Sequence, residues 1–228
     1  MTIPILFENE NFIIIDKPSG LVVHPYDHST EDTLLTFLQN HYPLIFAINN
    51  EKKLMDGRTI ALGGLVHKLD RDTSGVMVIT KNQQTFDEIK QQFIHHTAKK
   101  KYIALVEGLI ADETFRIDGP LGRNKKDYKQ SVNPINPRGE LREAITDVRV
   151  ISRGGNMTLV ELSPITGRTH QLRAHMAHIG HPIIGDRAYG STKDSPRIML
   201  HAKSLSFSLL GEDYSFEVEP PFTLDTMK

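Results

Sequence analysis

Short apolar runs broken by polar turns recur along most of the chain, whereas only three segments carry apolar residues at helical spacing. The strand-like runs cover residues 3–8, 12–16, 21–24, 64–69, 76–80, 101–108, 144–152, 157–163, 198–210 and 214–218. This pattern predicts an α/β protein of the α+β type. We expect a mixed, largely antiparallel central sheet flanked by helices and loops.

The three expected helices each have a recognisable start or end. The first covers residues 32–41, with Thr30 or Ser29 as its cap. Asn82 can cap the second, which should end near residue 96 and whose apolar stripe contains Phe86, Ile89, Phe93 and Ile94. The third is opened by residues 166–169 and ended by Gly180, with Leu172, Met176 and Ile179 on one face. Residues 46–59 and the basic, proline-containing stretch 121–141 are expected to be loops.

No break in composition resembles a linker, so we expect a single domain over residues 1–228, with two lobes and a cleft as a variant of that arrangement. The chain has no run of about 18 apolar residues, which argues against a membrane span. Its first residues lack a signal-peptide pattern. The sequence also has no exposed apolar stripe of the kind that would indicate an oligomer. We therefore expect a cytoplasmic monomer.

Composition excludes several kinds of chemistry. The chain contains no cysteine, so disulfides, thiolate zinc sites, iron–sulfur clusters and cysteine nucleophiles are ruled out. The net charge is −1, yet residues 95–175 hold 14 Lys and Arg against 9 Asp and Glu, leaving 13 against 19 elsewhere. This asymmetry indicates either one basic face that suits an anionic partner or a solvated mixture of charges.

The densest group of reactive side chains follows the apolar residues 64–66. His67, Lys68, Asp70, Arg71 and Thr73 lie within one short stretch, which returns to an apolar run at residue 76. Loops held between buried strands are favoured places for function. The alternative is a structural turn in which a carboxyl or hydroxyl group caps the backbone.

A second polar stretch covers residues 164–175. Arg168, His170, Gln171 and Arg173 lie at the start of the third helix, where the positive end of the helix dipole suits a phosphate or a carboxylate. The alternative is a solvated helix face. A third interpretation takes His170, His175 and His178 as metal ligands, although their spacing does not match the HExxH pattern and no glutamate accompanies them.

Several segments together resemble the RluA family of RNA pseudouridine synthases. The two strongest are HKLDRDTSG at residues 67–75 and PITGRTHQLR at residues 164–173. Four shorter segments follow the family's order as well, at residues 16–20, 100–108, 180–186 and 200–202. The matching segments lie between about residue 5 and residue 219. The family usually has arginine where this chain has Lys68, which keeps the charge and loses the planar guanidinium.

This resemblance implies the pseudouridine synthase fold and an isomerase that converts uridine to pseudouridine in structured tRNA or rRNA. It assigns the central role to Asp70, which acts at ribose C1′ or C2′ of a flipped-out nucleotide. It further implies that Arg173 pairs with Asp70, that Tyr102 stacks on the uracil and that Leu200 covers the other face of the base. The implied substrate-binding residues are His67, Lys68, Arg71, Thr73, Arg168, His170 and Gln171. No cofactor, metal, membrane or DNA is expected.

The resemblance covers the catalytic domain alone, without the S4-type domain that precedes it in some relatives. We therefore expect RNA affinity to come from the catalytic domain's own basic residues, and to fall steeply with salt. Two alternatives stay open, which are a non-catalytic RNA-binding or RNA chaperone protein and a metal-dependent hydrolase that uses the histidines.

Overall fold

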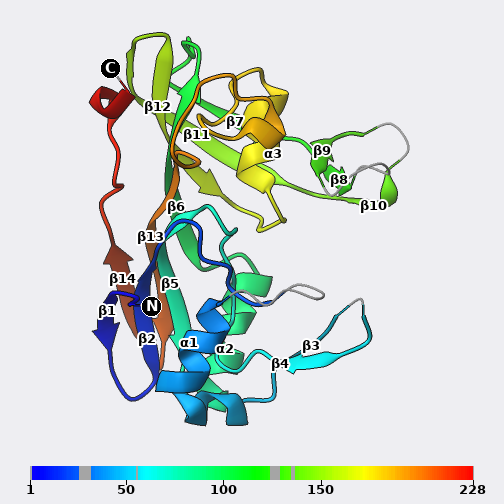
Figure 1. Ribbon diagram of the computed structural model, residues 1–228, viewed down its shortest axis with the longest axis vertical. Coiled ribbons are helices and arrows are strands. Elements are labelled where there is room, and N and C mark those ends of the chain that lie inside the picture. The colour runs from blue at the N-terminus through cyan, green and yellow to red at the C-terminus, as the bar shows by residue number, and fades with distance from the viewer. Residues whose placement is uncertain (1, 26–31, 55, 124–128, 135–136, 228) are drawn as a thin grey trace. The chain divides into compact units, whose positions relative to one another are not determined.

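Figure 1 shows the computed structural model of the protein, which describes residues 2–25, 32–54, 56–123, 129–134 and 137–227. The chain forms two compact units. The first unit contains residues 1–98 and 204–218, and the second contains residues 99–203 and 219–228. The strand β13 (Leu200–Leu209) is divided between them, because its residues 200–203 belong to the second unit.

The strands of the first unit follow the order β1 (Ile5–Glu8), β2 (Phe12–Lys17), β5 (Ser74–Thr80), β13 and β14 (Glu212–Glu217). The pairs β1–β2, β2–β5 and β13–β14 are antiparallel. A separate hairpin joins β3 (Glu51–Lys53) to β4 (Thr59–Ala61). Strand β5 is buried along its whole length, and it continues directly from the turn that carries Asp70.

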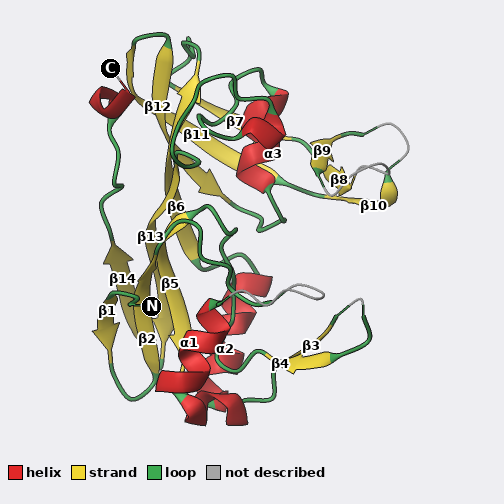
Figure 2. Ribbon diagram, viewed as in Figure 1, coloured by secondary structure: helices red, strands yellow, loops and turns green. Residues whose placement is uncertain are grey.

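Helices α1 (Leu34–His41) and α2 (Gln83–Ile94) and the short 3₁₀ helix η1 (Pro43–Ala47) complete the first unit (Figure 2). The Thr33 hydroxyl caps α1 by accepting from the Thr36 N–H, and the Asn82 side chain caps α2 by accepting from the Thr85 N–H. The core contains Phe12, which is fully buried and has the Phe207 ring at 5.2 Å in an edge-on arrangement.

The second unit has an antiparallel sheet in the order β6 (Lys99–Glu107), β12 (Met157–Pro164), β11 (Ile145–Gly154) and β7 (Thr114–Asp118). Helix α3 (Gln171–His178) contributes Leu172 and Met176 to its core. A separate three-stranded sheet has the order β10 (Arg138–Arg142), β8 (Leu121–Arg123) and β9 (Gln130–Val132). The 3₁₀ helices are η2 (Arg187–Tyr189) and η3 (Leu224–Met227).

The structure confirms the predicted α+β class and three α-helices among the described residues. Asn82 is the cap of α2 as predicted, and the strands expected at 144–152 and 157–163 pair as β11 and β12. Among the described residues, no helix is long and apolar enough to cross a membrane. The prediction of one domain over the whole chain stays a prediction.

Two predicted strands are absent. The carbonyl groups of Val22 and Val23 accept hydrogen bonds from the N–H groups of Leu34 and Leu35, so residues 21–24 support the start of α1 instead of a sheet. Residues 64–69 form no strand, and they lie beside β5 with one isolated bridge, Leu65–Ile79, and a hydrogen bond from the Thr80 N–H to the Gly64 carbonyl oxygen. A Cβ at Gly64 would lie 1.9 Å from the Thr80 carbonyl oxygen, so the two backbones approach too closely there for any other residue.

Three further predictions are wrong in detail. The 46–59 loop contains the last two residues of η1, all of β3 and the first residue of β4. The 121–141 loop contains most of the three-stranded sheet. Thr33 caps α1, whereas Ser29 and Thr30 lie outside the described residues. Ile94 is 53% exposed and therefore does not belong to the buried stripe of α2.

Candidate active site

Asp70 lies at the start of a tight turn that leads into β5. The Thr73 N–H donates to the Asp70 carbonyl oxygen at 3.2 Å, which closes the turn, and Thr73 and Ser74 are buried. The Asp70 side chain is half-buried, whereas Lys68 and Arg71 are exposed. A backbone turn at the end of a buried strand gives this carboxylate a defined position.

A second turn, at residues 17–20, holds the backbone of the Asp70 turn. The Lys17 ammonium donates to the carbonyl oxygen of Arg71 at 2.9 Å, and the Gly20 N–H donates to the same oxygen at 2.9 Å. The Ser19 hydroxyl donates to the Asp72 carbonyl oxygen at 2.7 Å. The two residues that follow Asp70 are therefore fixed by three hydrogen bonds from a distant part of the chain.

Lys17 is fully buried, which is unusual for a lysine. Its ammonium also donates to the carbonyl oxygens of Pro18 and Leu21, at 2.9 and 2.8 Å. Three acceptors match the three N–H donors of an ammonium group, so the buried charge is well solvated by the backbone. Lys17 is not among the predicted site residues, although it lies in the segment 16–20 that resembles the family.

His67 is held on the core side of this turn. Its Nε2 accepts from the Val78 N–H at 3.1 Å, and its ring stacks on Phe93 at 4.6 Å between centroids. Burial lowers the pKa of the His24 imidazole, and the positive charges of Lys52 and Lys68 nearby lower it further. The predicted substrate contacts of His67, Lys68, Arg71 and Thr73 stay predictions.

Arg173 lies on α3 in the second unit and is almost completely buried. Its guanidinium binds the Asp186 carboxylate in a bidentate pair, with N–O distances of 2.6 and 2.9 Å. The Tyr189 ring lies 4.9 Å from its central carbon. A planar guanidinium held by a fork of hydrogen bonds and an aromatic face has one orientation. Neither Asp186 nor Tyr189 was predicted as a site residue.

His170 precedes α3 in the left-handed conformation, at φ 55°. Its Nδ1 lies 3.0 Å from the Tyr189 hydroxyl, which also accepts from the Gln130 N–H at 3.0 Å. Tyr189 therefore connects the start of α3, strand β9 and the face of Arg173. These contacts make the left-handed His170 part of a supported structure.

Gln171 uses its whole amide inside the protein. Its oxygen accepts from the Thr166 hydroxyl and the Arg168 N–H, and its nitrogen donates to the Ile145 carbonyl and the Thr146 hydroxyl. These four bonds fix the turn that carries Arg168. The predicted substrate contact of Gln171 stays a prediction, whereas its observed contacts are structural.

His175 lies at the end of the same network. Its Nε2 donates to the Gly119 carbonyl oxygen and its Nδ1 accepts from the Thr146 hydroxyl, both at 3.0 Å. Burial lowers the pKa of this imidazole. Both ring nitrogens are occupied, which disfavours the metal interpretation. In the described part of the chain, no three His, Cys, Asp or Glu side chains are grouped to hold a metal ion.

Tyr102 is half-buried on β6, where its ring packs against the core of the second unit. Lys100 lies two residues earlier and therefore on the same face of the strand. Burial lowers the pKa of the Lys100 amine to about 8. Leu200, the first residue of β13, is buried in the same core.

The predicted site residues thus divide between the two units. His67, Lys68, Asp70, Arg71 and Thr73 belong to the first, and Tyr102, Arg168, His170, Gln171, Arg173 and Leu200 to the second. Each group is held by named contacts within its own unit. The pairing of Asp70 with Arg173 and the stacking roles of Tyr102 and Leu200 stay predictions.

Comparison with known proteins identifies the class. The family model for RNA pseudouridylate synthase matches residues 11–178, which include Asp70, Tyr102 and Arg173. The uncharacterized RNA pseudouridine synthase YlyB of Bacillus subtilis is 36% identical over 97% of this chain and 70% of its own length. A ribosomal large subunit pseudouridine synthase D from Zymomonas mobilis is 33% identical over 95% of this chain and 69% of its own length.

The human RNA pseudouridylate synthase domain containing 1 has a similar fold. Its structure aligns with a TM-score of 0.78 and 24% identity, over 100% of this chain and 86% of its own. The chain therefore belongs to the RNA pseudouridylate synthase family and, within it, resembles the RluA-type enzymes as its motifs predict. It is an isomerase of the class that converts uridine to pseudouridine in RNA.

Proposed function

We propose that the protein converts specific uridines of large-subunit ribosomal RNA to pseudouridine, with Asp70 as the catalytic carboxylate. Relatives named as ribosomal large subunit pseudouridine synthases support this choice of RNA. The observation that carries the catalytic assignment is the backbone support of the Asp70 turn by Lys17, Ser19 and Gly20. That support places one carboxylate with the precision that chemistry at a sugar carbon needs.

Asp70 can act in either of two ways. Its carboxylate attacks C1′, so that a C1′–O bond forms while the C1′–N1 bond breaks, or it removes the C2′ proton as N1 departs and a glycal forms. In both routes the uracil turns and C5 bonds to C1′, and in the first route the C1′–O bond to Asp70 breaks as this bond forms. C5 then loses its proton while the departed N1 gains one. In the glycal route the proton returns to C2′. The isomerisation has no net change in atoms or electrons.

The other site residues support this step. Arg173, oriented by Asp186, is proposed to keep Asp70 ionised where water is excluded. Tyr102 is proposed to stack on the uracil and to help remove the C5 proton. His67, Lys68, Arg71, Thr73, Arg168, His170, Gln171 and Leu200 are proposed to contact the RNA or the target base. We propose further that the chain works as one catalytic domain and as a monomer in the cytoplasm, with RNA and not DNA as its partner.

The test compares the wild type with Asp70→Asn on ribosomal RNA that carries tritium at uridine C5. The wild type should release tritium and the variant should release none, while both bind the RNA with similar affinity. Tritium release by Asp70→Asn at the wild-type rate would refute the role of Asp70. RNA binding without tritium release by the wild type would favour the RNA chaperone alternative.

A further inference from the structure

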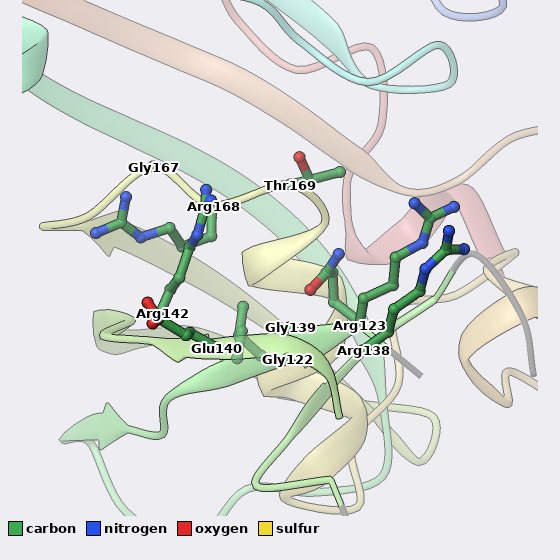
Figure 3. Close-up of a pocket in the computed structure, with 11 residues that line it drawn as sticks. Gly122, Arg123, Arg138, Gly139, Glu140, Arg142, Gly167, Arg168 and Thr169 are labelled. Atoms are coloured by element: carbon green, nitrogen blue, oxygen red, sulfur yellow. The ribbon is translucent and has the colours of Figure 1, made fainter. Parts of the chain in front are cut away.

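A basic pocket of about 400 Å³ lies in the second unit (Figure 3). The sheet of β8, β9 and β10 forms one part of its lining, and the turn at residues 167–169 forms another. Neither Tyr102 nor Arg173 belongs to the lining. The charged side chains around it are Arg123, Arg138, Arg142, Arg168 and Glu140.

Four guanidinium groups and one carboxylate leave this pocket with an excess of positive charge. Arg123 and Arg138 are direct partners in the register of β8 and β10. In Figure 3 their side chains run side by side and end together. Like charges directly opposite each other on neighbouring strands destabilise a sheet. Folding alone therefore gives no reason for this pair.

The protein does little to neutralise the excess. Within the described parts of the chain, the side chains of Arg123, Arg138 and Arg142 have no hydrogen-bonding or ion-pairing partner, and neither does the Glu140 carboxylate. The Arg168 guanidinium donates through Nε to the Glu143 carbonyl oxygen at 2.9 Å, which orients it without changing its charge. An anionic ligand would supply the missing counter-charge.

Size and chemistry indicate what this anion is. A guanidinium binds phosphate through two parallel hydrogen bonds and can also stack on a nucleobase. A pocket of about 400 Å³ lies within the range of small-molecule sites and is larger than one phosphate group requires. Glu140 offers an acceptor for an N–H group of a base.

We propose that this pocket is a nucleotide subsite, which takes the phosphate and base of an unpaired RNA nucleotide other than the uridine that reacts. The inference rests on the proposed function, because RNA is the substrate that supplies such a nucleotide. The subsite is connected to the catalytic machinery of its own unit. Gln130 lines the pocket, and its N–H binds the Tyr189 hydroxyl, whose ring covers Arg173.

The first experiment measures the subsite without turnover. Guanosine 5′-monophosphate is titrated into protein with ¹⁵N-labelled arginine, and the Nε–H signals are followed by NMR. The signals of Arg123 and Arg138 should shift, and the double variant R123Q/R138Q should bind at least tenfold more weakly. Guanosine and inorganic phosphate should each bind at least fivefold more weakly than the nucleotide.

The matched control is Arg116→Gln, which removes the same charge from an exposed arginine that is paired with Asp147 outside the pocket. It should bind the nucleotide as the wild type does. Any of three results would overturn the proposal. The first is no shift of the Arg123 and Arg138 signals, and the second is equal affinity for phosphate and nucleotide. The third is a loss of nucleotide affinity in Arg116→Gln as large as in the double variant. If the double variant does not fold, Arg142→Gln replaces it with the same criteria.

The second experiment uses tritium release from ribosomal RNA. R123Q/R138Q should raise KM at least tenfold and change kcat less than threefold, and its RNA affinity should depend on salt with a slope reduced by about 2. An unchanged KM would contradict the subsite. A wild type that releases no tritium would refute the proposed function instead. The nucleotide titration would then still show whether the pocket binds a nucleotide.

Discussion

The Arg173 guanidinium and the Asp186 carboxylate form a buried bidentate ion pair, with N–O distances of 2.6 and 2.9 Å. Asp186 is 1% exposed, so neither charge can turn to water if the other is lost. This pair fixes the arginine that is proposed to hold Asp70. Under that proposal, the pair connects the stability of the second unit to the activity of the enzyme.

Asp186→Asn should destabilise the protein by about 3–5 kcal/mol, because it leaves a buried guanidinium without its counter-charge. Tritium release should fall by at least tenfold under conditions where the variant is folded. Urea unfolding and single-turnover assays measure the two effects.

The matched control for that variant is Asp147→Asn, which breaks the Arg116–Asp147 pair. That pair has similar distances of 2.6 and 3.0 Å but lies on the surface, where ion pairs contribute little. Its effect should be much smaller on stability and negligible on activity. Equal effects of the two variants would show that burial of the Arg173–Asp186 pair is irrelevant.

Lys17→Met should cost about 1–3 kcal/mol of stability, since the carbonyl groups of Pro18, Leu21 and Arg71 lose a donor in a dry environment. We expect kcat to fall more than KM rises, because the Asp70 turn loses part of its support. Lys53→Met, at an exposed lysine of β3, is the control. A variant as active as the wild type would show that the other contacts suffice to hold the turn.

His175 should make the protein less stable in mild acid. Its folded-state pKa lies below the ordinary value of 6.5, so below about pH 6.5 the unfolded state binds more protons and the unfolding free energy falls. His24 should act in the same direction. Chemical denaturation at several pH values between 5 and 8 measures how the unfolding free energy depends on pH. This dependence should be shallower for His175→Gln than for the wild type, and identical dependences would contradict the role of His175.

Lys100 should titrate near pH 8, well below an ordinary lysine, because its amine is desolvated. Stability should rise with pH between about 8 and 10.5, where the unfolded chain holds a proton that the folded protein has released. NMR of ¹³C-dimethylated lysines should reveal one early titration that Lys100→Arg abolishes. An early titration that persists in this variant would assign it to another lysine.

The parts of the fold with local determinants were predictable. Asn82 followed by Phe86 and Ile89 defines α2, since a cap and an apolar stripe lie within a few residues of each other. The runs 21–24 and 64–69 were wrongly predicted to be strands, because apolar segments can be buried without joining a sheet. Their backbone partners, such as Leu34 for Val22, are set by tertiary structure.

The three-stranded sheet was missed because its sequence contradicts the usual strand pattern. Residues 121–141 contain two prolines and five lysines and arginines, and the facing Arg123 and Arg138 are an unfavourable cross-strand pair. The motifs identified the Asp70 turn and Arg173. They did not reveal Lys17, Asp186 or Tyr189 as supporting residues, because contacts between distant segments leave no periodic signal in one sequence.

Pseudouridine mapping of large-subunit ribosomal RNA tests the central claim most directly. RNA from cells that lack the protein is mapped before and after incubation with the purified wild type or with Asp70→Asn. The account predicts that specific uridines become pseudouridine with the wild type and stay unmodified with the variant. Modification by Asp70→Asn, or no new pseudouridine with the wild type, would contradict it.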